Sequence, residues 1–161
     1  MAKKQAVEKT NAMRKLDAMK IPFQEYTYEG DGTLTGVDVA AMLGQNADQV
    51  FKTLVTVGRT GEHYVFMIPV ADELDLKKAA KAAGDKNMEM VAVKELLSLT
   101  GYIRGGCSPV GMKKRYPTYF DETAVLWDEI AVSAGARGQQ MILPPEPLAQ
   151  LVGAKFTDLI L

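Results

Sequence analysis

The sequence is poor in the residues that most often carry hydrolytic and metal chemistry. Its 161 residues include one cysteine, Cys107, and one histidine, His63. A single cysteine excludes a disulfide within the chain and any zinc site built from several cysteines. With one histidine as well, the composition argues against a zinc hydrolase, and we expect neither a metal ion nor a cofactor.

The sequence also lacks an excess of charge and a long apolar run. Nineteen lysines and arginines face 20 aspartates and glutamates, so the net charge is −1. Such a chain has no long-range field to attract a polyanion, and any contact with RNA must be local. The start, Met-Ala-Lys-Lys-Gln, is not apolar like a signal peptide, and no stretch is apolar enough to cross a bilayer. We therefore expect a cytoplasmic protein that does not bind membranes.

What remains is the composition of an ordinary soluble domain. Hydrophobic residues make up 47% of the chain and charged residues 24%, which is too balanced for intrinsic disorder. A chain of this length can bury its own core, and no repeat or linker divides it. We expect one domain over 1–161.

Helix-like and strand-like segments alternate along the chain. Apolar residues at helical spacing, with caps at Thr35 and Asp75 and stops at Gly44 and Gly84, predict five helices. These cover 11–20, 36–43, 76–83, 93–99 and 145–151. Alternating or β-branched runs predict strands over 23–28, 51–57, 64–70, 117–120, 129–133 and 140–143.

The spacing also predicts which side chains face the core. Met19, Met42 and Leu76 fall on the apolar sides of the first three helices, whereas the lysines at 77, 78 and 81 face solvent. Several connections between strands are too short for parallel crossovers. We therefore expect an α+β fold with a curved mixed, largely antiparallel sheet and peripheral helices.

Neither His63 nor Cys107 makes a convincing catalytic group. A Ser-His-Asp or Cys-His arrangement needs a base held against the nucleophile, and only His63 could serve. His63 lies in a strand beside a tight turn, where a structural role is favoured. Cys107 lies in a glycine-rich loop, yet a packed thiol is the commoner case. If the protein is an enzyme, we expect it to use neither residue.

The segment 100–111 is the most informative, with four glycines and a proline around Ser108. Glycine lets backbone groups come close to a ligand, so this loop could cradle a terminal ribose or an ester carbonyl. The same composition suits a tight irregular turn, and both interpretations stand. A second small-residue loop covers 133–140. The spacing of a phosphate-binding P-loop is absent.

Four basic side chains and one aromatic each have two interpretations. Lys113, Lys114 and Arg115 follow the first glycine loop and could bind the phosphates of an RNA end, although a solvated basic turn is commoner. Lys52 lies in an otherwise apolar strand, so it must either reach the surface or meet a partner in a pocket, and composition favours the surface. Tyr28 is an ordinary anchor at a strand end or a site residue.

Four segments stand out when taken in order: Val-Phe-Lys-Thr-Leu at 50–54, Leu-Asp-Leu-Lys-Lys at 74–78, the glycine-rich run at 100–114, and Ser-Ala-Gly-x-Arg-Gly at 133–138. This ordered set resembles the YbaK/EbsC family, which is similar to the editing domain inserted in bacterial prolyl-tRNA synthetases. The likeness extends from Ala12 to Phe156. It implies a curved sheet of the partial-barrel kind.

The resemblance also implies an activity, hydrolysis of the ester that joins a wrong amino acid to tRNA(Pro). Cysteine is the family's characteristic substrate, and a second sieve is useful because a pocket shaped for proline cannot exclude a residue of similar size. In such deacylases the substrate's own thiol attacks its carbonyl and releases a cyclic thiolactone. The implied partners are the aminoacylated end of tRNA and prolyl-tRNA synthetase. The alternatives are a deacylase for alanine or another small amino acid, and a non-catalytic module that binds a nucleotide or aminoacyl end.

By position, the resemblance assigns Lys52 to the aminoacyl end or terminal phosphate and Tyr28 to the pocket edge. Gln140 stands where some relatives carry aspartate, so the charge that could pair with the substrate amine is missing. The remaining implied contacts are the ester-facing Gly105 and Gly106, and the substrate-binding Thr35, Thr53, Cys107, Ser108, Pro109, Ser133 and Gly135. Thr35 occupies a place where some relatives have a bulkier aromatic residue.

Overall fold

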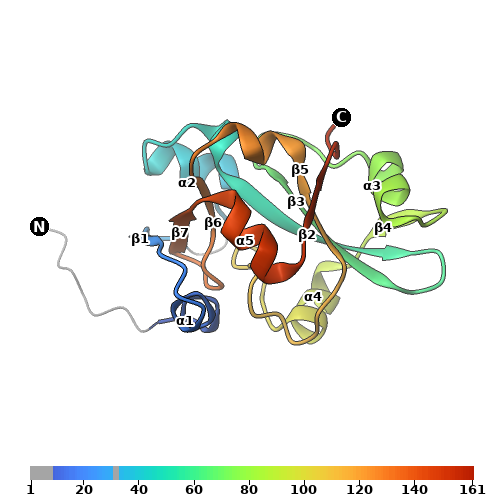
Figure 1. The fold of residues 1–161 in the computed structure, drawn as a ribbon, viewed down its shortest axis with the longest axis horizontal. Coiled ribbons are helices and arrows are strands. Elements are labelled where there is room, and N and C mark those ends of the chain that lie inside the picture. The colour runs from blue at the N-terminus through green and yellow to red at the C-terminus, as the bar shows by residue number, and fades with distance from the viewer. Residues whose placement is uncertain (1–8, 31–32) are drawn as a thin grey trace, which may run out of the picture.

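The computed structural model describes residues 9–30 and 33–161, in which helices surround two β-sheets (Figure 1). Residues 1–8, from which the character of the N-terminal segment was predicted, lie outside the described residues, as do Asp31 and Gly32. The helices are α1 (Asn11–Ala18), α2 (Gly36–Met42), α3 (Leu76–Ala83), α4 (Val93–Thr100) and α5 (Pro145–Val152), with 3-10 turns η1 (Ala47–Gln49) and η2 (Glu122–Leu126). The strands are β1 (Gln24–Thr27), β2 (Phe51–Gly58), β3 (His63–Pro69), β4 (Met88–Met90), β5 (Thr118–Asp121), β6 (Ile130–Ser133), β7 (Gln139–Leu143) and β8 (Lys155–Thr157). No helix in the described part is long and apolar enough to cross a membrane.

The strands form two open sheets. One has the order β1-β7-β6 and is antiparallel throughout, and the other has the order β4-β2-β3-β5-β8. In the second, β3 pairs with β5 and β5 with β8 in parallel, and the remaining pairs are antiparallel. A parallel bridge between Val50 and Ala131 joins the two sheets. The predicted α+β fold with mixed, largely antiparallel pairing is confirmed, and the curved layer is divided into two sheets that do not close.

Three predicted core side chains are exposed instead. In α1, Thr10 caps the helix by accepting from the Met13 backbone N–H, but the helix ends at Ala18. Met19 therefore leaves the apolar face and is 60% exposed. Met42, the last residue of α2, and Leu76, the first of α3, are also exposed, because the buried face of each helix lies in its middle turn.

The lysines of α3 are not all solvated. Lys78 is half-buried, forms an ion pair with Asp158 at 2.9 Å and donates to the Ile160 carbonyl at 2.6 Å. It therefore holds the C-terminal segment against α3. Lys77 and Lys81 are exposed, as predicted.

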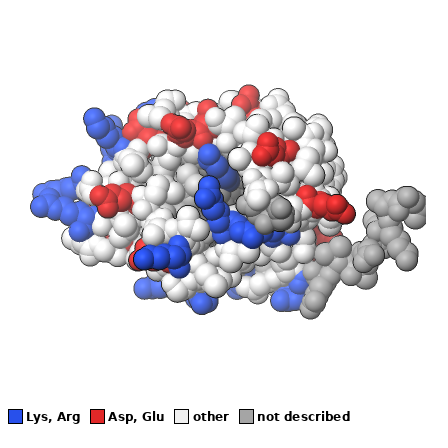
Figure 2. All heavy atoms as spheres, turned by 180° about the vertical axis from the view of Figure 1, so that it is seen from behind, with Lys and Arg blue, Asp and Glu red and all other residues white. Residues whose placement is uncertain are grey.

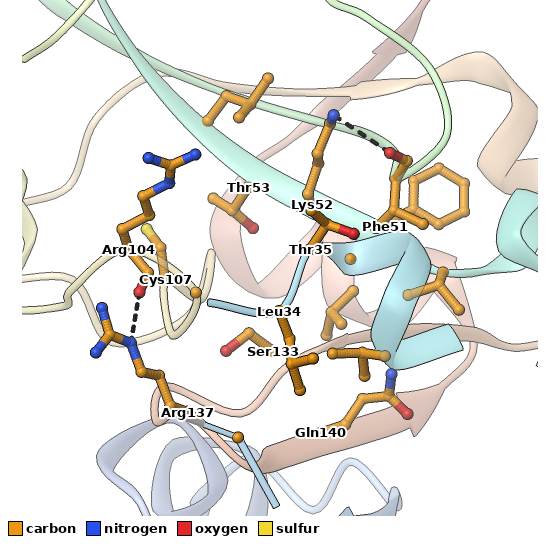
Figure 3. Close-up of a pocket in the computed structure, with 18 of the residues that line it drawn as sticks. Leu34, Thr35, Phe51, Lys52, Thr53, Arg104, Cys107, Ser133, Arg137 and Gln140 are labelled. Carbon is orange, nitrogen blue, oxygen red and sulfur yellow. Dashed lines mark hydrogen bonds between the residues drawn. The ribbon is translucent and has the colours of Figure 1, made fainter. Parts of the chain in front are cut away.

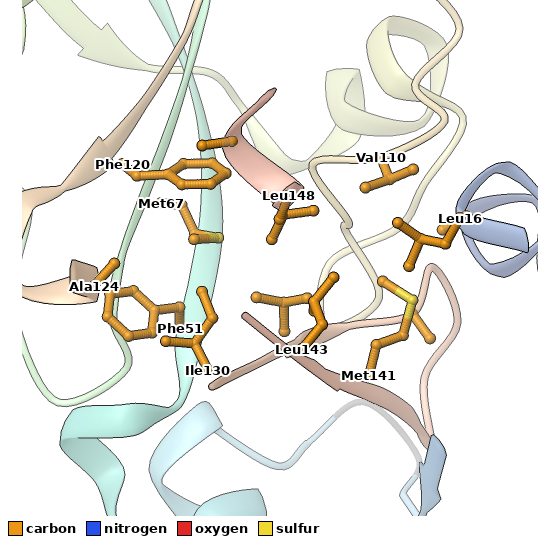
Figure 4. Close-up of a cluster of buried hydrophobic side chains, with 14 of the residues drawn as sticks. Leu16, Phe51, Met67, Val110, Phe120, Ala124, Ile130, Met141, Leu143 and Leu148 are labelled. Carbon is orange, nitrogen blue, oxygen red and sulfur yellow. The ribbon is translucent and has the colours of Figure 1, made fainter. Parts of the chain in front are cut away.

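The main core lies between the two sheets and is closed by α1 and α5 (Figure 4). It contains Phe51, Met67, Phe120, Leu143 and Leu148, all buried. Each of these side chains stabilises the fold by about 1.5–3 kcal/mol relative to exposure. The largest buried cluster thus lies directly behind the beginning of β2.

Strand β2 is fixed by packing along most of its length. Val50, at its start, and Phe51, Leu54 and Val55 pack into four different hydrophobic clusters. Interiors of this kind are close-packed and deform little. Side chains that β2 presents away from these clusters therefore have a well-defined position.

Candidate functional site

A cleft of about 730 Å³ opens beside β2. Its walls come from β2, residues between β1 and α2 such as Tyr28 and Thr35, the start of α4, and the two small-residue loops that the sequence singled out. The volume is in the range of pockets that hold small organic ligands. Of the predicted site residues, eight line it: Tyr28, Thr35, Lys52, Thr53, Gly105, Cys107, Ser133 and Gln140.

Lys52 projects from β2 into this cleft and is half-buried (Figure 3). Its Nζ donates to the Val70 carbonyl at 3.3 Å. Burial lowers the pKa of the ammonium group, and the charges of Glu73 and Asp72 partly restore it. The preference for a surface position, based on composition, is wrong, because the strand's apolar neighbours are packed on both sides and leave the cleft as the space for this side chain.

Two buried oxygen atoms in the described part of the chain have no hydrogen-bond partner, Thr53 Oγ1 and Gln139 Oε1. Both residues line the cleft. An unpaired buried polar atom costs about 1–3 kcal/mol, so such atoms are expected where a ligand supplies the missing bond. The cleft wall therefore has unused hydrogen-bonding capacity.

The two glycine-bearing loops pack directly on each other. A Cβ built at Gly106 would lie 3.0 Å from the backbone nitrogen of Arg137 and 3.1 Å from the Ala136 carbonyl carbon. One built at Gly135 would lie 2.9 Å from the Tyr102 ring, and Gly135 also has φ +96. These glycines are therefore required for loop contact. The turn interpretation and the ligand interpretation of this region both apply, to different residues.

Four predicted site residues lie behind the cleft wall: Gly106, Ser108, Pro109 and Gly135 do not line it. Ser108 is fully buried, and its hydroxyl accepts from the Val110 backbone N–H at 3.2 Å. The structure therefore does not bring these four predicted residues to the cleft surface, and Gly106, Ser108 and Gly135 instead make contacts within and between the two loops.

Cys107 lines the cleft but is 7% exposed, and burial raises the pKa of its thiol to about 12. The thiolate needed for nucleophilic attack is therefore scarce at neutral pH. His63 does not line the cleft and packs edge-on against Tyr116, with ring centroids 5.9 Å apart. Both side chains take structural positions, as the sequence favoured.

The hydroxyls of Thr35 and Ser133 are already engaged locally. Thr35 caps α2 by accepting from the Asp38 backbone N–H, while its own backbone N–H donates to the Asp38 carboxylate. Ser133 Oγ accepts from the Gly135 backbone N–H at 3.1 Å. Tyr28 follows β1, and its N–H donates to the Gly138 carbonyl. These residues shape the mouth and far wall of the cleft.

Gln140 is 3% exposed and forms a reciprocal amide pair with Gln45. Gln45 Nε2 donates to Gln140 Oε1 at 2.6 Å, and Gln140 Nε2 donates to Gln45 Oε1 at 3.1 Å. The pair holds the Gln140 amide in place and brings no charge to the wall. Sequence reasoning missed Gln45, which is 95 residues away, and no local signal could have revealed it.

The charged residues that line the cleft are all cationic. Besides Lys52 they are Arg104 and Arg137, one in each glycine-bearing loop, and no aspartate or glutamate among the described residues lines the cleft. Both arginines were missed as site residues, although their place within the two quoted motifs was a usable signal. Figure 2 shows basic side chains gathered near the middle of one face of the molecule.

The basic run after the first loop lies elsewhere. Lys113, Lys114 and Arg115 are exposed and do not line the cleft. Lys113 lies along Gly101, and the Arg115 guanidinium lies beside Gly153 at the end of α5. The solvated-turn interpretation fits this placement.

Comparison with known proteins identifies sequences and structures of the same kind. The aminoacyl-tRNA editing domain family matches residues 31–151. A protein of Enterococcus faecalis, provisionally named Cys-tRNA(Pro)/Cys-tRNA(Cys) deacylase EbsC, is 48% identical over 99% of this chain and 98% of its own length. A proline–tRNA ligase of Shouchella clausii is 31% identical over 65% of this chain, which is 18% of the ligase. A solved structure described provisionally as a trans-editing enzyme for prolyl-tRNA synthetase has a TM-score of 0.79 and 28% identity, over 96% of this chain and 99% of that one.

Proposed function

Because the chain belongs to the aminoacyl-tRNA editing domain family and is an aminoacyl-tRNA deacylase, we propose that it removes cysteine from Cys-tRNA(Pro) and that the substrate's own thiol is the nucleophile. The similarity to a protein named for Cys-tRNA(Pro) and Cys-tRNA(Cys) supports the amino acid. The observation that carries the mechanism is the cleft's chemistry: three cations line it, its one thiol has a pKa of about 12, and the chain's histidine lies elsewhere.

In this mechanism the enzyme contributes position and charge. The substrate thiol gives its proton to solvent water, and the sulfur attacks the carbonyl carbon of the same aminoacyl group. The new C–S bond closes a thiolactone as the ester C–O bond breaks, and a proton returns to the ribose oxygen. Water then opens the thiolactone to free cysteine. Holding the thiol near its carbonyl is the kind of task that a preformed cleft performs well.

The residues of the cleft divide this work among them. The Lys52 ammonium group faces the developing negative charge of the acyl oxygen or the adjoining phosphate. The Thr53 hydroxyl, which has no partner among the described residues, donates to a substrate oxygen. The Gly105 backbone approaches the ester without side-chain obstruction.

Action in trans together with prolyl-tRNA synthetase, in the cytoplasm, is part of the same proposal. A net charge of −1 gives the chain no long-range attraction for tRNA, so recruitment by a tRNA-bound synthetase would raise its local concentration. Adding the synthetase to a deacylation assay should therefore lower the KM for Cys-tRNA(Pro).

The test compares three esters of the same tRNA, carrying cysteine, serine and alanine. Serine has nearly the shape of cysteine without its thiol, so we expect release of cysteine to exceed release of serine by about a hundredfold or more, as for loss of an intramolecular nucleophile. Cys107→Ala should keep cysteine release within about twofold of wild type, because that thiol is protonated.

Three results would contradict the proposal. Equal release of alanine and cysteine would identify a deacylase for small amino acids. A large loss in folded Cys107→Ala would assign the nucleophile to the protein. Release of no amino acid would leave a binding module.

A further inference from the structure

We propose that Arg104 and Arg137, here called the arginine fork, bind the phosphate backbone of the single-stranded 3′ end of tRNA at the rim of the cleft. The inference rests on the proposed function, since it names how the RNA leading to the ester is held. The two arginines lie 33 residues apart and belong to different loops. Their role is separate from that of Lys52, which is half-buried on β2.

The hydrogen bonding of Arg137 leaves the useful part of its guanidinium free. Its Nε donates to the Arg104 backbone carbonyl at 2.9 Å (Figure 3). That bond fixes the plane of the group while the two Nη atoms keep their N–H donors. Arg104 takes part in this hydrogen bond only through its backbone carbonyl, so the bond leaves the Arg104 guanidinium available. Within residues 9–30 and 33–161, the ion pairs are Lys9–Asp17 and Lys78–Asp158, so neither arginine is neutralised by a carboxylate.

The glycines of the first loop explain why Arg137 takes this position. Gly105 has φ +85, which a residue with a side chain rarely adopts, and a Cβ there would lie 3.5 Å from Arg137 Nε. Arg137 therefore lies across Gly105, while Gly106 abuts the Arg137 backbone. Both ends of the arginine are held before any ligand arrives. A preorganised guanidinium loses less entropy on binding than a free one.

The chemistry of the rim selects a phosphate over other ligands. The planar set of N–H donors on a guanidinium group matches two oxygens of a phosphate, and the charged residues that line the described part of the cleft are all cations. Both arginines are exposed whereas Lys52 is half-buried. The arginines therefore lie where a single-stranded RNA would leave the cleft. An ester seated by Lys52 and Thr53 must be followed outward by the phosphodiester that precedes the terminal adenosine.

The experiment compares Cys-tRNA(Pro) with cysteinyl-adenosine, an ester of the same amino acid that carries no phosphate. For Arg137→Ala we expect kcat/KM on the tRNA to fall about tenfold or more, as for loss of charge-assisted hydrogen bonds, with cysteinyl-adenosine hydrolysis unchanged. The dependence of log KM on log salt should become shallower by about 0.7 for one lost phosphate contact.

Two further variants and a control separate charge from geometry. Arg104→Ala should behave like Arg137→Ala, since its backbone carbonyl remains. Arg137→Lys should keep most of the salt dependence but should not recover the rate of deacylation. Lysine is a point charge and lacks the planar set of N–H donors of a guanidinium group. Arg59→Ala, an exposed arginine in the β2–β3 turn, should match wild type on both esters.

Three outcomes would overturn the fork. An equal loss on both esters would mean that Arg137 only supports the loop, and no loss on either would remove it from the site. A loss seen only when prolyl-tRNA synthetase is present would assign the arginines to a protein partner.

A binding measurement keeps this test independent of the proposed function. If wild type hydrolyses no cysteine ester, the proposed function fails, and anisotropy with a labelled single-stranded RNA ending in CCA still tests the fork. Weaker binding by Arg137→Ala, about tenfold, supports it, and equal affinity refutes it.

Discussion

The two ends of the β2–β3 hairpin use polar groups in opposite ways. At the turn end, the Asp85 carboxylate accepts from the backbone N–H groups of Arg59 and Asn87 and from the Tyr64 hydroxyl at 3.1 Å. At the cleft end, Lys52 has one 3.3 Å hydrogen bond, and Thr53 Oγ1 has no partner among the described residues. The same antiparallel pairing of β2 with β3 runs through both ends of the hairpin.

The difference separates polar groups that are saturated within the fold from polar groups that still have hydrogen-bonding capacity. Hydrogen bonds from Arg59 and Asn87 lower the pKa of Asp85, and burial raises the pKa of Tyr64 to about 12. At neutral pH the Asp85 carboxylate therefore remains an acceptor and the Tyr64 hydroxyl remains a donor. At the other end, burial lowers the pKa of Lys52. A saturated cluster stabilises the hairpin, whereas an under-used one lowers stability and can gain from a ligand.

The sharpest way to break the comparison is Lys52→Ala. We expect deacylation of Cys-tRNA(Pro) to fall by about a hundredfold or more, because substrate positioning is lost. Thermal stability should not fall, since the variant removes a partly desolvated charge with one long hydrogen bond. The assay is single-turnover release of cysteine, with circular dichroism to follow unfolding. Unchanged turnover would return Lys52 to a passive position in the wall.

The turn end should respond in the reverse sense. A Cβ at Gly58 would lie 2.0 Å from Asp85 Oδ2, a carboxylate whose hydrogen bonds resist movement. Gly58→Ala should therefore destabilise the protein by about 1–3 kcal/mol, the usual cost of overpacking. Urea unfolding measures this, with the exposed Thr60→Ala in the same turn as control. Activity per folded molecule should stay unchanged, and a selective loss of activity would show that the two ends are coupled.

The smallest effect tests the electrostatics of the cleft end. The charge of Glu73 raises the pKa of Lys52 against the effect of burial. In Glu73→Gln that pKa falls further, so Lys52 loses its proton at lower pH. If deacylation needs the charged lysine, the alkaline decline of kcat/KM moves to lower pH. Glu89→Gln, at an exposed residue of β4, is the matched control. A shift to higher pH in Glu73→Gln would contradict a cationic role for Lys52.

Local sequence signals located most of the secondary structure because they act within one element. The Thr35 and Asp75 caps and the left-handed Gly84 lie where predicted. The wrong predictions of burial for Met19 and Leu76 arise at the ends of helices, where one or two residues decide whether a side chain is covered. The division into two sheets depends on the bridge from Val50 to Ala131, a contact between residues 81 positions apart that no local pattern encodes.

The site divides in the same manner. The ordered motifs at 50–54, 100–114 and 133–138 led to Lys52, Thr53 and the glycine loops, and the lysine was also unusual for an apolar strand. They did not reveal Gln45, whose only distinction is its pairing with Gln140 across the fold. Nor could they separate Gly105, which lines the cleft, from Gly106, which faces the neighbouring loop.

The contact between the two small-residue loops limits how this cleft can be altered. Gly106 fits against the backbone at Ala136 and Arg137 with no room for a methyl group, and Arg137 in turn bonds to Arg104. The segments 101–107 and 133–138 therefore form one structural unit. A graft or insertion that changes one loop alone would separate the pair, so redesign of this wall of the cleft has to exchange both segments together.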